Sequence, residues 1–320
     1  MKAIKYSWGN AYVPEEWNAA VVVPVPKKGD LTDRNNYRGI ALMSTTMKVL
    51  NGIFAKRLMA LITRFGLLDP AQVGFINREE AVAQVACLVE ILDRRKLKGQ
   101  ETYLCFVDLA KAYDSVPHEA LMMKAERFGI HGRALEWLKS IYKRPRVCCR
   151  KADGGFSEER PYDRGVRQGD PLSPALFNVY MDDWLNAPLH QLGIEVEIDT
   201  RFGNGSGRER LAALMYADDI VMIAENMGQM RRMANNLSEW SEVTRRGKKV
   251  LNHRFHHRRS RKDSISAAST CQIHPNLRRM SIKLKVVLFV NAIPGHDVLK
   301  RGGGGGFVAV TANRKLSCVL

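Results

Sequence analysis

Three aspartates lie where apolar segments end, and their positions suit the binding of hard cations. Asp108 directly follows the apolar run Tyr103–Val107, and Asp218 and Asp219 separate two further apolar runs. A carboxylate at the end of a buried strand is costly unless a cation or a proton neutralises it. Carboxylate oxygens bind Mg²⁺, and two such ions about 3.5–4 Å apart serve in-line phosphoryl transfer. The three carboxylates are therefore the first candidates for chemistry.

An aspartate pair is weak evidence on its own. A second pair, Asp182 and Asp183, occurs in a segment with helical spacing, where it reads as a solvated helix turn. Taken alone, Asp218 and Asp219 are also explained more simply as a hairpin turn. The metal-site interpretation therefore depends on the motifs that accompany them.

The surrounding segments predict a mixed fold of helices and strands. Apolar runs predict a strand at Val21–Val25, a buried strand at Tyr103–Val107, and a hairpin from Leu211–Tyr216 and Ile220–Ala224. Its tip carries the aspartate pair, so these strands would position all three carboxylates. Helical apolar spacing predicts helices at Met47–Phe65, Glu80–Arg95, Pro117–Phe128, Pro171–Leu185 and Met227–Glu242.

The positive charge is distributed very unevenly along the chain. The 320 residues carry a formal net charge of +17, of which +15 falls in residues 245–320 with 17 Lys and Arg against two acids. Residues 1–244 have a net charge of only +2. Hydrophobic periodicity also stops near residue 245, and Gly302–Gly306 is a glycine run. We predict a folded domain at 1–244 and a basic, disordered tail at 245–320.

Cysteine usage and the absence of long apolar runs indicate in which cellular compartment the protein is expected. The six cysteines show no C-x-x-C pairing, which favours free thiols over a disulfide framework. The first ten residues lack a signal-peptide pattern, and the longest apolar run, Val286–Val290, is too short for a bilayer. We therefore expect an intracellular protein, nuclear or cytoplasmic, that is not secreted and does not enter membranes.

The chain contains, in order, the segments Pro24–Gly29 with Asn36–Ile40, Gln72–Phe75, Phe106–Val116, Arg167–Phe177 and Tyr216–Asp219. In residue types and order, these five segments resemble the polymerase motifs of reverse transcriptases of the non-LTR (LINE-type) retrotransposon kind. Tyr216-Ala-Asp-Asp219 resembles their C motif, and Phe106–Val116 resembles their A motif. Arg167–Phe177 resembles the B motif found in non-LTR elements and group II introns. Upstream, Pro24-Val-Pro-Lys-Lys-Gly29 with Asn36-Tyr-Arg-Gly-Ile40 is similar to the fingers, and Gln72-Val-Gly-Phe75 to the connection that follows. The match spans roughly residues 15–243.

The resemblance implies a catalytic centre with two Mg²⁺ ions, with Mn²⁺ as a substitute. Asp108 and Asp218 are implied to hold both ions, and the Leu109 carbonyl to help the ion on the nucleotide side. Asp219 is implied to be a catalytic-motif member less tightly tied to the metals.

The resemblance also implies a site for dNTPs. Lys28 and Arg38 look like the fingers cations for the triphosphate, although on general exposure alone both would be solvated loop residues. Tyr113 occupies the place of an aromatic that collides with a ribose 2′-OH, which makes the substrate dNTP and the product DNA. Gln168 is implied to lie in the same nucleotide site.

Template and primer contacts are implied for three residues. Gln168 would hydrogen-bond the template strand, Gly169 would let the backbone approach the templating base pair, and Tyr216 would contact the template–primer. The expected partners are an RNA template, a DNA or RNA primer and dNTPs, with no specific protein partner. Asp114 and Asp170 are assigned structural roles such as helix capping.

Both ends of the chain depart from the family pattern. No endonuclease precedes the fingers, and no thumb is recognisable after the Met227–Glu242 helix, so we expect a domain truncated at both ends. Lys248 and Lys249 lie near the place of the family's general-acid lysine, but the surrounding pattern is missing and the role is not transferred. The tail is explained either as a phosphate-binding arm or as arbitrary sequence beyond a break in the ancestral frame.

The predicted fold is α+β: a right-hand polymerase palm, with an antiparallel sheet backed by helices, and fingers, without a thumb. The predicted function is that of an RNA-directed DNA polymerase, a nucleotidyltransferase that adds dNTPs to a primer 3′-OH. The alternative is a degenerate, inactive retroelement remnant that at most binds nucleic acid through its basic tail. A protein–protein module derived from the palm is a third possibility, for which no positive sign exists.

Overall fold

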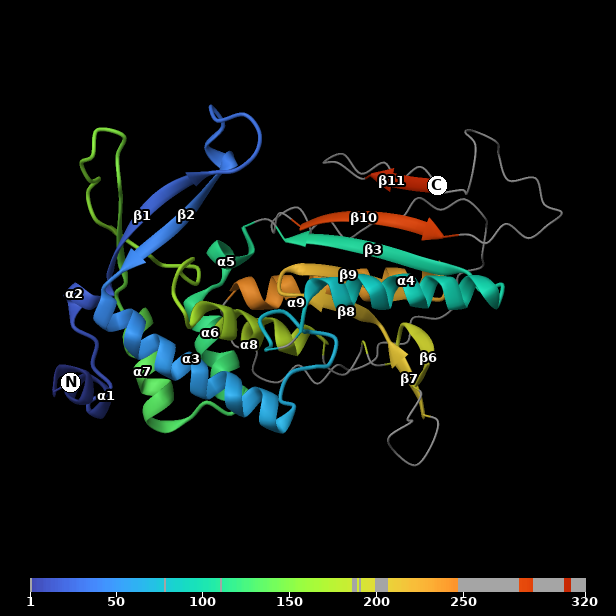
Figure 1. Ribbon diagram of the computed structural model, residues 1–320, viewed down its shortest axis with the longest axis horizontal. Coiled ribbons are helices and arrows are strands. Elements are labelled where there is room, and N and C mark those ends of the chain that lie inside the picture. Colours follow the sequence, from blue (N-terminus) through green and yellow to red (C-terminus); the bar gives the residue numbers. More distant parts are fainter. Residues whose placement is uncertain are drawn as a thin grey trace. The chain divides into compact units, whose positions relative to one another are not determined.

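The computed structural model describes residues 2–77, 79–109, 111–185, 189, 191–198, 207–246, 282–289 and 308–311 (Figure 1). The chain divides into two compact units. Unit 1 comprises Met1–Leu68 and Lys111–Asp183, and unit 2 comprises Asp69–Ala110 and Trp184–Leu320. Within the described part, no helix is long and apolar enough to cross a membrane.

Unit 1 combines a small sheet with a group of helices. The sheet has the strand order β2-β1-β4-β5, in which β1 pairs antiparallel with β2 and parallel with β4. Pro24 and Pro26 fit within β1 because β4 pairs only with residues 19–22, which leaves the proline end of the strand with one neighbour. The elements are α1 Lys2–Gly9, α2 Glu15–Asn18, β1 Ala19–Pro26, η1 Arg34–Asn36, β2 Tyr37–Met43, α3 Thr45–Phe65, α5 Ala112–Ser115, α6 His118–Arg127, α7 Gly132–Tyr142, β4 Arg146–Cys149, β5 Arg160–Pro161 and α8 Ser173–Leu185.

The core of unit 1 follows from the apolar spacing of its helices. α3 buries Met47, Leu50, Phe54, Leu58 and Ile62, one or two residues in each turn, and ends at Gly66 in the left-handed conformation that glycine adopts at low cost. The Trp8 ring of α1 contacts the rings of Phe54 and Trp137, each with a centroid separation of 5.9 Å. These contacts join α1, α3 and α7.

Unit 2 is built on a five-stranded antiparallel sheet of order β11-β10-β3-β9-β8. Two further strands, β6 and β7, form an antiparallel ribbon. The elements are α4 Ala81–Leu97, β3 Thr102–Leu109, β6 Ile194–Ile198, β7 Gly207–Leu211, β8 Ala213–Tyr216, β9 Asp219–Ala224, α9 Met227–Arg246, β10 Ile282–Phe289 and β11 Val308–Thr311.

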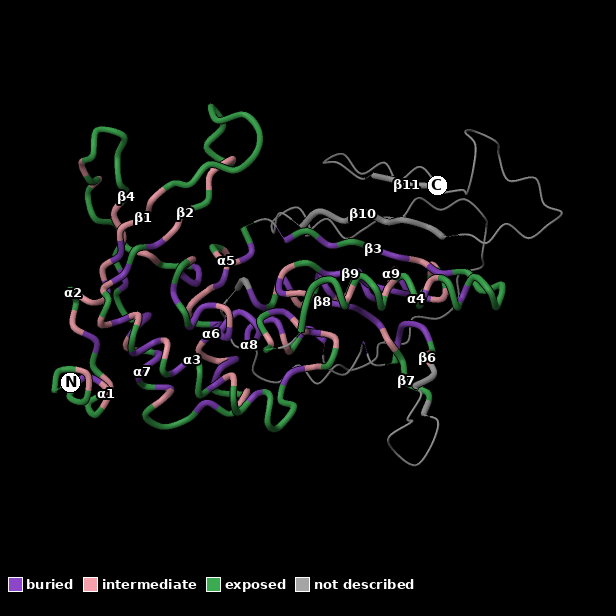
Figure 2. Tube along the Cα trace, in the orientation of Figure 1, coloured by how far each residue is buried: buried purple, intermediate pink, exposed green. Residues whose placement is uncertain are grey.

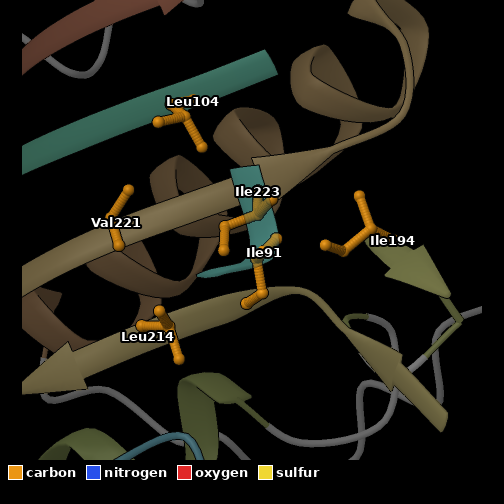
Figure 3. Close-up of a cluster of buried hydrophobic side chains, with 6 residues drawn as sticks. All are labelled: Ile91, Leu104, Ile194, Leu214, Val221 and Ile223. Atoms are coloured by element: carbon orange, nitrogen blue, oxygen red, sulfur yellow. The ribbon is translucent and has the colours of Figure 1, made fainter. Parts of the chain in front are cut away.

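One face of this sheet carries an apolar cluster covered by α4. The cluster consists of Ile91 of α4, Leu104 of β3, Leu214 of β8, Ile194 of β6, and Val221 and Ile223 of β9 (Figure 3). The strand residues share a face because Leu104 pairs with Ile223, Leu214 pairs with Val221, and side chains alternate along each strand. α9 contacts β3 and β9. The remaining surface of α4 is mostly exposed (Figure 2).

The elements predicted from the sequence are confirmed with small shifts in their ends. The helix predicted at Met47–Phe65 is α3, and the hairpin predicted at Leu211–Ala224 is β8–β9, with Leu211 belonging to β7 instead. Cys105 of β3 is buried, and the cysteines within the described ranges are free thiols, as their spacing predicted.

Two strands of unit 2 come from the segment predicted as a tail. β10 and β11 lie within residues 245–320, and β10 pairs with the whole length of β3. The sequence analysis predicted neither strand. The other residues after 246, which include Lys248, Lys249 and the histidines at 253, 256 and 257, lie outside the described residues, so the domain boundary near 245 stays a prediction.

Candidate active site

The antiparallel pairing of β3 with β9 brings two of the predicted carboxylates together. Asp108 and Asp219 are direct cross-strand partners, at the last of six consecutive pairs that begin with Tyr103 and Ala224. Asp218 adjoins this pair in the turn between β8 and β9. Because residues directly opposite in an antiparallel pair have Cβ atoms about 4.5–5.5 Å apart, the carboxylates share one region of the surface.

The face that bears these carboxylates changes from covered to open along the strands. Leu104 and Ile223 are buried beneath α4, whereas Phe106, two residues further along β3, is 40% exposed. Asp108 and Asp219 follow at the exposed end of the same face. The apolar end fixes the register of the two strands, and the register places the aspartates.

The aspartate turn has an unusual backbone conformation. Ala217 is 3% exposed and has a φ of 59°, in the left-handed region that residues with a Cβ rarely adopt. Its N–H and its carbonyl are both hydrogen-bonded to the side-chain amide of Gln72. The sequence analysis quoted Gln72 within a motif but gave it no role. The sequence offered no signal for this role, because both the burial of Gln72 and its partner 145 positions away appear only in the fold.

The donor set suits a hard divalent cation. Asp108 and Asp219 are cross-strand neighbours on one face of the sheet, Asp218 adjoins them in the chain, and carboxylate oxygens are the ligands that Mg²⁺ takes. Within the described ranges, however, no group of three or more His, Cys, Asp or Glu side chains is arranged to hold a metal. The residues present therefore match the chemistry of the predicted ions without forming a closed ligand cage.

The predicted triphosphate cations lie on the β1–β2 hairpin of unit 1. Lys28 follows β1 and Arg38 lies in β2, and both are exposed. Residues 24–35, at the tip of this hairpin, are all exposed (Figure 2). The Lys27 N–H donates to the Asn36 carbonyl at 2.6 Å and closes the loop that carries Lys28.

Tyr113 is held by two contacts within unit 1. Its ring stacks on Phe177 of α8, with a centroid separation of 4.8 Å and an interplanar angle of 17°. Its carbonyl accepts from the Val166 N–H at 2.8 Å. The side chain is half-buried. A ring fixed by stacking can act as a rigid steric barrier.

The loop before α8 holds the remaining predicted residues. The Gln168 carbonyl accepts from the Ala41 N–H at 2.7 Å. Gly169 has a φ of 107°, and a Cβ there would lie 2.9 Å from the Ala41 carbonyl oxygen. Backbone geometry alone thus requires glycine. The Gln168 side chain hydrogen-bonds Asp114, but burial dominates and the pKa of Asp114 is raised.

Asp170 has the structural role expected of it. Its carboxylate accepts from the Leu172 N–H at 3.0 Å and from the Asn51 side-chain amide at 2.9 Å. Burial raises its pKa despite these bonds. The predicted residues therefore fall into two sets: the carboxylates and Tyr216 belong to unit 2, and Lys28, Arg38, Tyr113, Gln168 and Gly169 belong to unit 1.

An antiparallel sheet with paired aspartates beside a hairpin turn is the arrangement expected of the palm of a right-hand polymerase. A model of the family described as "Reverse transcriptase (RNA-dependent DNA polymerase)" matches residues 25–249, and the chain belongs to this family. The expected palm-and-fingers fold is thereby confirmed, while the predicted absence of a thumb stays a prediction.

The curated relatives are proteins of retrotransposable elements. The Pol polyprotein of the type-1 element R2 from Popillia japonica is 29% identical over 215 residues, which cover 67% of this chain and 29% of that protein. The polyprotein of the type-2 element R2DM from Drosophila melanogaster is 30% identical over 214 residues, with 67% and 19% covered. The chain thus spans less than a third of each relative. The resemblance to non-LTR reverse transcriptases is confirmed.

A solved structure of Candida albicans telomerase with a fragment of telomeric RNA is also similar. It shares 12% identity at a TM-score of 0.49, over 76% of this chain and 43% of that chain.

Proposed function

We propose that this chain is the catalytic core of an RNA-directed DNA polymerase. It would add dNTPs to the 3′-OH of a DNA or RNA primer on an RNA template. The observation that carries the proposal is the cross-strand pairing of Asp108 with Asp219, beside Asp218, within the region that matches the family.

In the proposed reaction, the primer 3′-hydroxyl loses its proton to solvent and its oxygen attacks the α-phosphorus of the dNTP. The bond from the α-phosphorus to the bridging oxygen breaks, and pyrophosphate leaves. Asp108, Asp218 and the Leu109 carbonyl would hold two Mg²⁺ ions, which when bound supply charge neutralisation and lower the pKa of the attacking hydroxyl. The exposure of the Asp108 and Asp219 end of the palm face supports this assignment, because substrates must reach it.

The residues of unit 1 would select and hold the nucleotide. Lys28 and Arg38, exposed on the hairpin, would donate to the triphosphate. The stacked ring of Tyr113 would exclude a ribose 2′-OH. Gln168 would contact both the dNTP and the template, and Gly169 and Tyr216 the template–primer. The closeness of the Gly169 backbone to Ala41 supports a loop of fixed shape.

The test is primer extension on an RNA template with dNTPs and Mg²⁺, comparing the wild type with Asp218→Asn. Asp93→Asn is the matched control, because Asp93 is an exposed aspartate of α4 in the same unit. We expect extension by the wild type and by the control, and a loss of about 10²- to 10³-fold in the Asp218 variant, the scale of removing an electrostatic catalytic group. A folded wild type that never extends a primer would support the inactive-remnant alternative.

A further inference from the structure

The turn that carries Asp218 is held in a costly conformation. Ala217 and Asp218 form a two-residue hairpin loop between β8 and β9, a position where glycine, asparagine and aspartate are usual when φ is positive. Ala217 instead adopts a φ of 59° with a Cβ present. A strained backbone of this kind persists only where the surroundings over-determine it.

The side-chain amide of Gln72 holds this residue from both sides. Its Oε1 accepts from the Ala217 N–H at 2.9 Å, and its Nε2 donates to the Ala217 carbonyl at 3.1 Å. The Gly74 N–H also donates to Oε1, at 2.9 Å. Gln72 is 1% exposed, so these bonds form away from competing water. A neutral amide is the side chain that can accept and donate in this way at once.

The backbone around Gln72 is itself fixed to β8. The Met215 N–H donates to the Ala71 carbonyl at 2.8 Å, and the Val73 N–H donates to the Met215 carbonyl at 3.1 Å. Gln72 and Met215 thereby form a parallel bridge. Residues 71–75 thus run alongside the strand that leads into the aspartate turn, and the Gln72 amide is aimed from a fixed base.

Gly74 lets the two segments approach each other. A Cβ at position 74 would lie 2.2 Å from the Ala217 nitrogen, far inside van der Waals contact. Gln72 and Gly74 together therefore form a cradle for the Ala217 backbone. The peptide so held leads directly to Asp218.

We propose that Gln72 is a positioning residue, which orients Asp218 by clamping both backbone polar groups of Ala217. The inference rests on the proposed function, because it assigns Asp218 a catalytic task. Gln72 itself is 1% exposed, so the proposal has it act through Ala217 and not by contact with a substrate. Its loss is expected to slow the chemical step, since displacement of a reacting group by about 1 Å can cost about 10²-fold in rate.

The first measurement is single-turnover incorporation by the full chain, comparing the wild type with Gln72→Met. Methionine has a similar length and can neither accept nor donate comparably. We expect the maximal rate to fall by about 10- to 100-fold while the affinities for dNTP and primer–template stay within about 3-fold, the pattern of an interaction that acts in the transition state.

Gln229→Met is the matched control. Gln229 is also a buried glutamine of unit 2, and its Oε1 accepts from the Glu225 N–H at 3.2 Å, at the end of β9 away from the aspartates. This variant is expected to retain the wild-type rate. Equal rate losses in both variants, or a wild-type rate in Gln72→Met, would overturn the proposal.

The second measurement is residue-resolved hydrogen exchange, which needs no activity. In the wild type, the Ala217 and Gly74 amides should be protected, and Gln72→Met should accelerate both while Gln229→Met leaves them unchanged. Rapid exchange of both amides in the wild type overturns the clamp, even if the variant does not fold. If the wild type extends no primer, the proposed function fails. The exchange rates of the Ala217 and Gly74 amides then still test whether Gln72 holds the Ala217 backbone.

Discussion

Replacing Gly74 by alanine tests the cradle by steric pressure instead of by loss of hydrogen bonds. The added Cβ would lie 2.2 Å from the Ala217 nitrogen, whereas ordinary contact begins at 3.4 Å. The Gly74 segment and the aspartate turn must therefore separate by about 1.2 Å to restore ordinary contact, a shift comparable to the misplacement that costs about 10²-fold in rate. The nitrogen that must move is the one that donates to Gln72, so the clamp is lengthened as well.

The single-turnover rate of Gly74→Ala should therefore be about 10²-fold lower than that of the wild type. Inserting a methyl group into a packed region costs about 1–3 kcal/mol, so the folded state should survive with a lower free energy of unfolding. Primer extension on an RNA template and thermal unfolding measure the two effects separately.

The control for this variant is Gly9→Ala. Gly9 ends α1 in unit 1, and a Cβ there meets nothing within 4 Å. It should keep the wild-type rate. A Gly74→Ala enzyme within about 3-fold of the wild-type rate would refute the idea that the position of the turn limits catalysis.

Three further outcomes follow from contacts within unit 1. Burial lowers the pKa of Lys124 to about 8, so the folded chain releases this proton at lower pH than the unfolded chain. The contribution of Lys124 to the free energy of unfolding is therefore least favourable below pH 8 and should rise by about 2 kcal/mol between pH 7 and 9.5. Urea unfolding should show this rise in the wild type and not in Lys124→Met. Tyr113→Ala removes the ring stacked on Phe177 and should reduce discrimination against rNTPs by about 10-fold or more, measured as the ratio of rNTP to dNTP incorporation efficiencies. Gly169→Ala should lower the melting temperature, because its φ of 107° and the nearby Ala41 oxygen exclude a Cβ at a cost of about 1–3 kcal/mol.

Local pattern was enough to locate the carboxylates. The apolar runs predicted Asp108 at the end of a strand and Asp218 and Asp219 at the tip of a hairpin, and the alternation of side chains fixes which face Asp108 and Asp219 share once β3 and β9 pair. Helix positions were also recoverable, because α3 and α9 have sustained apolar spacing. Their ends shifted by a few residues, since terminal turns are set by tertiary contacts.

Long-range partners were not recoverable from pattern. Gln72 and Ala217 are 145 positions apart, and nothing in either segment specifies the other. The left-handed conformation of Ala217 was equally hidden, because alanine gives no signal for positive φ. The sequence analysis treated Asp182 and Asp183 as solvated, and Asp183 is indeed exposed, but only the fold shows that it also pairs with the buried Lys124 at 2.6 Å.

The pairing of β10 with β3 bears on how the charged segment after residue 244 can be studied. Eight consecutive residues of β3, from Thr102 to Leu109, have their partners in β10. Removing the segment would convert β3 into an edge strand with a row of unpaired N–H and C=O groups, a template for association with other chains. A shortened protein could then self-associate and lose nucleic-acid binding for reasons unrelated to charge. Neutralising substitutions within the 320-residue chain separate the two effects, because they leave β3 paired with β10.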